Sequence, residues 1–136
     1  GYPSPEAELE LMRQEDRQDM LTHTRPALTR GQVRQLRLQA AQILAAEPLL
    51  RYIQALVQAT RHHAAIRAGL SPRAGLALLK ASRAHAYLMG RDAVLPDDMQ
   101  AVFCAKAAHR LTIQVSSNGT TAQSLAEEIL RATPLP

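Results

Sequence analysis

The sequence predicts an all-α protein, a helical bundle of about five helices with one possible short extended segment near residues 111–115. Hydrophobic residues make up 46% of the 136 residues but aromatic residues only 3%, so a core must consist mainly of Leu, Ala, Ile and Val. This mixture favours helices, since strands prefer β-branched and aromatic residues. A chain of this length buries roughly two thirds of its unfolded surface, which is enough for one sizeable core.

Residues 1–28 are interpreted as a leading helix followed by a linker. Ser4 is placed to cap a helix whose first residue is Pro5. Residues 14–19 are strongly polar, and Pro26 disfavours helix at the residue before it. We therefore expect a surface linker here and a compact domain over residues 29–136.

Two helices open this domain. Thr29 and Gln32 have the spacing of a capping box, and Pro48 separates the first helix from the second. The expected inner faces carry Val33, Leu36, Ala40 and Ile43 on the first helix and Leu49, Ile53 and Val57 on the second. On the outer side of the first helix, Arg30, Arg34 and Arg37 form a basic stripe.

Three further helices are expected. One is capped by Ser71, starts at Pro72 and extends toward Gly90; one starts at Pro96; the last covers residues 121–132. Their inner faces would carry Ala77, Ala81, Ala84 and Leu88, then Met99, Val102, Phe103 and Ala107, then Leu125 and Ile129. Residues 68–70 read as a loop. The core is expected to include Leu36, Ile43, Ile53, Val57, Leu79, Leu88 and Val102.

Residues 111–115 alternate like a short strand before a turn at residues 116–119. One strand cannot make a sheet, so we expect this segment to run extended along the bundle or to pair with parts outside the chain.

Because the chain has a single cysteine and no run of 18 apolar residues, an internal disulfide and a membrane span are not expected. These features favour a cytoplasmic protein that does not contact a membrane.

No phosphate-binding loop occurs, and the six glycines are scattered, so the chain is not expected to be an enzyme alone. No metal site is expected, because the neighbouring His62 and His63 would point about 100° apart on a helix. Cys104 is interpreted as a small core residue. Asp97 and Asp98 are explained by a helix start rather than by a cation site.

Several short motifs in the same order resemble the lid of MoxR-family AAA+ ATPases. They are LLRYI at residues 49–53, LVQATR at 56–61, RAGLSPRAGL at 67–76, GRD at 90–92, PDD at 96–98 and HRL at 109–111. YPSPEAE at residues 2–8 is similar to the segment that leaves the family's nucleotide-binding domain, to which residues 1–28 would connect. The chain departs from the family's pattern at Ala64 and at residues 102–105, where prolines are common.

The resemblance implies a lid that folds over a nucleotide held by another domain of the same protein. Arg73 would be the sensor-2 arginine that reaches the nucleotide phosphates, Ser71 the cap that positions it, and Arg67 and Arg83 helpers. The parent protein would bind ATP and Mg²⁺, neither of which is expected on the isolated chain. It would form homo-hexameric rings and mature a client protein or insert a metal cofactor.

Two alternatives stay open. The net charge of +4 suits anionic partners, and the Arg30, Arg34 and Arg37 stripe would then belong to a helix-turn-helix nucleic-acid-binding domain. Alternatively, the chain is a non-catalytic interaction module that docks a partner helix on its alanine-rich face.

Overall fold

The computed structural model describes residues 3–13, 23–114 and 119–135. The chain divides into two units, residues 1–33 and 34–136. The first unit contains helix α1 (Pro5–Arg13). As predicted, Ser4 caps α1: its Oγ accepts a hydrogen bond from the amide of Ala7 at 3.3 Å. No residue of α1 is buried. The predicted linker at residues 14–19 lies outside the described residues.

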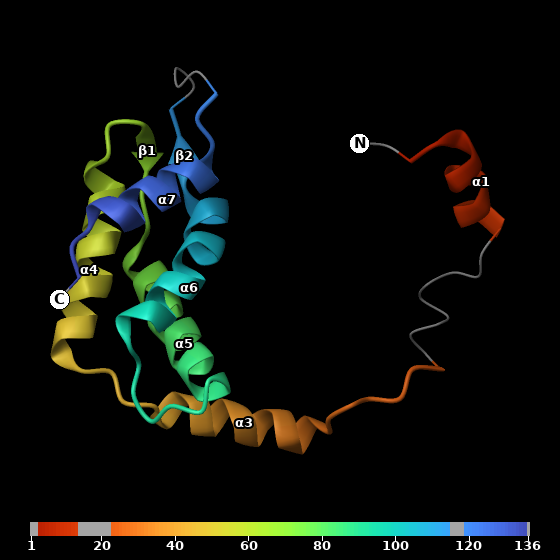
Figure 1. Cartoon of the computed structure of the whole chain (residues 1–136), viewed down its shortest axis with the longest axis horizontal. Coiled ribbons are helices and arrows are strands. Elements are labelled where there is room, and N and C mark those ends of the chain that lie inside the picture. The colour runs from red at the N-terminus through yellow and green to blue at the C-terminus, as the bar shows by residue number, and fades with distance from the viewer. Residues whose placement is uncertain (1–2, 14–22, 115–118, 136) are drawn as a thin grey trace. The chain divides into compact units, whose positions relative to one another are not determined.

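The prediction of an all-α fold is confirmed. After α1, the described residues form five α-helices, a 3₁₀ helix and two very short strands (Figure 1). In chain order these are α3 (Arg30–Gln42), α4 (Glu47–His62), β1 (Ile66–Ala68), α5 (Pro72–Leu88), α6 (Pro96–Ala107), η1 (Ala108–Arg110), β2 (Thr112–Ile113) and α7 (Ala122–Ala132). Helix α5 packs between α4 and α6, and α7 packs on α4 and α6.

One contiguous core lies between α4, α5, α6 and α7. Its largest fully buried apolar side chains are Phe103, Leu56, Leu70, Leu78, Met99 and Leu125. Among the predicted core residues, Ile43, Ile53 and Val57 are buried and Leu79 packs against the core. The prediction was wrong for Leu36 and Leu88, which are 38% and 78% exposed, and Val102 is only half-buried.

The predicted inner face of α5 was also wrong. The residues that α5 buries are Ala74, Leu78, Ser82 and Ala86, while Leu88 lies at the exposed end of the helix. Alanines stand on more than one side of α5, so apolar spacing alone does not single out one face. The face is set by α6, which packs along α5, and α5 ends where Gly90 adopts a φ of +71°.

The extended segment near residue 112 finds its partner within the chain. Strand β2 pairs antiparallel with β1, with Ile66 opposite Ile113, and the amide of Gln114 donates to the carbonyl of Ala65 at 3.0 Å. The expectation that this segment runs along the bundle or pairs with parts outside the chain was therefore wrong for residues 112–114, and so was the reading of Ala68 as loop. Val115 lies outside the described residues. Of the predicted turn, residues 116–118 lie outside the described residues.

Candidate functional site

Hydrogen bonds from the last turn of α4 fix the turn that leads into α5. The buried hydroxyl of Thr60 accepts a hydrogen bond from the amide of Leu70 at 2.9 Å and donates to the carbonyl of Val57 at 2.7 Å. Arg61 adds a second tie, because its Nε donates to the carbonyl of Leu70 at 2.8 Å. A side chain is excluded at Gly69, where a Cβ would lie 2.7 Å from the backbone of Thr60 and Arg61. The start of α5 is therefore anchored to α4.

Ser71 and Arg73 stand on this anchored turn. The Oγ of Ser71 accepts a hydrogen bond from the amide of Ala74 at 3.2 Å, so Ser71 is the N-cap of α5, as predicted, and Pro72 fills the first helical position. Arg73 follows in the first turn, between exposed Pro72 and buried Ala74. Its side chain is exposed and forms no hydrogen bond or ion pair with the described residues. The guanidinium of Arg73, which is permanently charged and can donate two parallel hydrogen bonds, is therefore available to bind an anion at this anchored turn.

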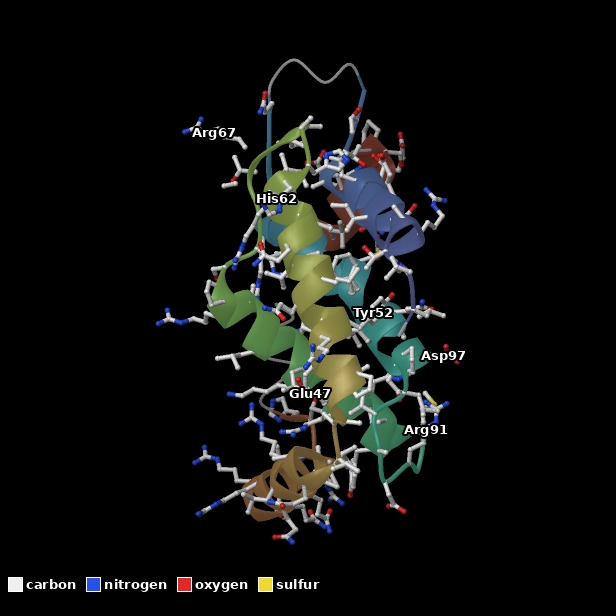
Figure 2. The ribbon with its side chains drawn as sticks, turned by 90° about the vertical axis from the view of Figure 1, so that its left-hand side faces the viewer. Glu47, Tyr52, His62, Arg67, Arg91 and Asp97 are labelled. Carbon is white, nitrogen blue, oxygen red and sulfur yellow. The ribbon has the colours of Figure 1, made fainter. Side chains whose placement is uncertain are left out.

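The two expected helpers do not gather around Arg73. Arg67 lies on β1 and points away from the helices (Figure 2). Arg83 is ten residues farther along α5, which corresponds to roughly 15 Å of helix. The Ser71–Arg73 turn instead depends on Thr60 and Gly69, neither of which was predicted from the sequence to position it. The signal available in the sequence was Gly69, two residues before the N-cap Ser71.

A buried carboxylate holds the opposite end of α5. Asp98, in the first turn of α6, has no exposed surface. Its Oδ1 accepts from Nδ1 of His85 at 2.8 Å and from the guanidinium of Arg91, and its Oδ2 accepts from the amide of Leu95 at 2.8 Å. The prediction that Asp98 serves a helix start is confirmed, and the same side chain also ties α5 and the connecting loop to α6.

Burial alone would raise the pKa of Asp98, because removal from water disfavours a carboxylate. The hydrogen bonds from the Leu95 amide and from His85, with the positive charge of Arg91, outweigh that effect and hold the pKa below its ordinary value. The carboxylate is therefore charged at neutral pH and fully occupied by structural partners, which argues for a positioning role rather than proton transfer.

The remaining candidate residues take local roles. His62 bonds the carbonyl of Gln58 at 2.9 Å, and His63 lies 3.5 Å from Glu128 of α7. Within the described part of the chain, no three His, Cys, Asp or Glu residues lie together as a metal site would require. Cys104 packs against the core, and burial, with the charge of Glu127, raises the pKa of its thiol, which disfavours a nucleophilic thiolate.

Comparison with known proteins identifies the family of the fold. The family model described as AAA lid domain matches residues 58–129, a stretch that contains Thr60, Gly69, Ser71, Arg73 and Asp98. Among the described residues, no helix is long and apolar enough to cross a membrane.

Three bacterial proteins resemble the chain in sequence. The uncharacterized protein YeaC of Bacillus subtilis is 30% identical over all of this chain and 43% of its own length. Chaperone MoxR1 of Mycobacterium tuberculosis is 32% identical over 95% of the chain and 34% of its own length. Protein MoxR of Paracoccus denitrificans is 40% identical over 49% of the chain.

A crystal structure of a candidate ATPase from Cytophaga hutchinsonii superimposes with a TM-score of 0.77 at 26% identity. The match covers 100% of this chain and 44% of that one, so the chain spans less than half of the length of this neighbour and of the relatives. These matches show that the chain belongs to the MoxR family of AAA+ ATPases and carries its AAA lid domain.

Proposed function

We propose that this lid closes over ATP and Mg²⁺ held by a nucleotide-binding domain of the same protein, and that Arg73 is the sensor-2 arginine that contacts the phosphates. The observation that carries the proposal is an exposed guanidinium without a partner in the described lid, on a helix turn fixed by Ser71, Thr60 and Gly69. An arginine so placed fits a phosphate, because the fixed backbone limits the directions in which the fork can point.

In this proposal one lid residue binds the phosphates, and the others position it. Arg73 would hold phosphate oxygens, and Ser71 fixes the backbone from which Arg73 projects. The nucleotide, when bound, supplies the free energy of hydrolysis. Thr60, Arg61 and Gly69 couple the turn to α4, and the Asp98 cluster couples the far end of α5 to α6, so the lid would move as one body.

At the level of the whole protein, we propose a cytoplasmic ATPase that assembles into a ring, a homo-hexamer, and couples hydrolysis to chaperone-like maturation of other proteins or to metal-cofactor insertion. The name chaperone given to the Mycobacterium tuberculosis relative supports the chaperone-like role. The client protein would be recognised by the assembled ring.

The test is ATP turnover and nucleotide affinity of the complete ATPase with Arg73→Ala and Arg73→Lys. We expect Arg73→Ala to lower turnover at least about tenfold, which corresponds to about 1.4 kcal/mol, with unchanged circular dichroism. Arg73→Lys should restore part of the activity, since it keeps the charge but loses the fork. Arg67→Ala, another exposed arginine of the same lid, is the matched control and should leave turnover unchanged. Equal turnover of Arg73→Ala and Arg67→Ala would exclude the sensor role.

A further inference from the structure

The surface between α4 and α5 holds an open groove of about 350 Å³ that no residue of the described chain fills. We call it the α4–α5 groove. Figure 2 faces α4, with Glu47 and His62 near its two ends and α5 beside it. The apolar side chains that line the groove are Leu50, Ile53, Val57, Pro72, Leu76 and Leu79. It runs along α4 from Leu50 to Arg61, roughly 16 Å at 1.5 Å per residue.

Leu50 and Leu76 leave part of the apolar surface of the groove exposed to solvent. Ile53 and Val57 are buried at 6% exposure each, whereas Leu50 is 37% and Leu76 is 62% exposed. Gly75 keeps the space between them open, because a Cβ there would meet only the Cγ2 of Val57, at 3.5 Å. Apolar side chains spaced by three and four on two neighbouring helices are the pattern that receives one face of a third helix.

The charged groups around the groove are mostly positive. Arg61 lines one end, Lys80 is one helical turn beyond Leu76, and Arg83 is one turn beyond Leu79. The lining residues include no carboxylate; their other polar members are Gln54 and Gln58. Glu47, the acidic residue at the start of α4, is already paired with Arg51 at 3.2 Å. An occupant that carries carboxylates would therefore be favoured.

Arg83 provides a separate indication of an anionic occupant. It is half-buried, its Nε is buried, and the guanidinium donates to no acceptor and pairs with no acid among the described residues. A charged side chain whose Nε is removed from water without an acceptor is costly, and a carboxylate brought by a partner would pair with the charge. Arg83 lies on the face of α5 that continues from Leu76 and Leu79.

We infer that the α4–α5 groove binds an acidic amphipathic helix of a partner protein. Leucine-like side chains of that helix would cover Leu50 and Leu76, and its carboxylates would meet Lys80 and Arg83. This proposal is separate from the nucleotide contact proposed for Arg73, and it uses a different side of α5 from the alanine-rich face expected from the sequence.

The test is fluorescence anisotropy of the 136-residue chain with a labelled synthetic peptide of about 16 residues, long enough to form a helix, that has Leu on one face and Glu on the others. A second peptide with Lys in place of Glu tests the charge. We expect the acidic peptide to bind at least tenfold more tightly than the basic one, with an affinity that falls as salt is raised.

Matched variants assign the binding to the groove. Leu76→Ser removes an exposed wall of the groove, and Leu88→Ser removes a leucine of α5 that is 78% exposed outside it. Gly75→Leu fills the groove, and Gly75→Ala is its control. We expect Leu76→Ser and Gly75→Leu to weaken the acidic peptide at least tenfold, and the two controls to bind like the wild type.

Several outcomes would overturn the inference. Equal binding by Leu76→Ser and Leu88→Ser would place the peptide elsewhere, and binding of the acidic peptide no tighter than that of the basic one would remove the charge argument. Self-association that Leu76→Ser abolishes would make a second copy the occupant, and duplex DNA binding lost in the same variant would make it a nucleic acid. Loss of peptide binding in the complete ATPase would mean that the groove is covered by another domain of the same protein.

Discussion

The amide of Leu70 donates a hydrogen bond to the buried hydroxyl of Thr60 at 2.9 Å, across ten residues of chain. This bond joins the last turn of α4 to the residue that precedes the cap of α5. Because Leu70 is 1% exposed, its amide has no access to water and depends on that hydroxyl. The orientation of the Ser71–Arg73 turn therefore depends on a threonine of another helix.

Replacement of this hydroxyl should destabilise the lid. Thr60→Val keeps the side-chain shape but leaves the Leu70 amide buried without an acceptor, which costs about 1–3 kcal/mol. Urea unfolding followed by circular dichroism measures the difference. Thr60→Ser retains the hydroxyl and should recover most of the loss. A Thr60→Val protein as stable as the wild type would show that the bond contributes nothing.

Two glycines beside α4 should respond in opposite directions. Gly69→Ala places a Cβ 2.7 Å from backbone atoms of Thr60 and Arg61, so the backbone must shift, at a cost of about 1–3 kcal/mol. Gly75→Ala places its Cβ 3.5 Å from Val57 in ordinary contact, and the helix preference of alanine should stabilise it by up to about 1 kcal/mol. Thermal unfolding of both variants measures this contrast, and equal midpoints would contradict it.

The Asp98 cluster should make stability depend on acidic pH. Since the folded protein lowers the pKa of Asp98, the unfolded chain binds a proton more readily, and stability increases with pH through that range. The contribution is complete above the ordinary value of 3.8 and is lost as pH falls through the folded value. Urea unfolding of wild type and Asp98→Asn from about pH 2 to about pH 6 measures it. The variant should be less stable at neutral pH and depend less on pH. Parallel curves would exclude Asp98 as a source of the dependence.

Two leucines of α5 should differ sharply in their importance. Leu78 has no exposed surface, so Leu78→Ala should cost about 2–5 kcal/mol through lost burial and a cavity. Leu88 is 78% exposed, and Leu88→Ala should change stability by no more than about 0.5 kcal/mol. Denaturant unfolding compares them directly, and a large effect of Leu88→Ala would mean that this leucine is covered.

Local chemistry in the sequence determined the helices and the cap of the candidate site. Ser4, Ser71, Pro72 and Pro96 act within their own helix starts, so their roles follow from neighbours three or four positions away. The tertiary structure alone decided which side of α5 is buried, because alanines on several sides leave the choice to α6. It also decided the pairing of β1 with β2, the bond from Leu70 to Thr60 and the burial of Asp98. Each joins residues distant in the chain, whose contact depends on packing of the whole domain rather than on local preference.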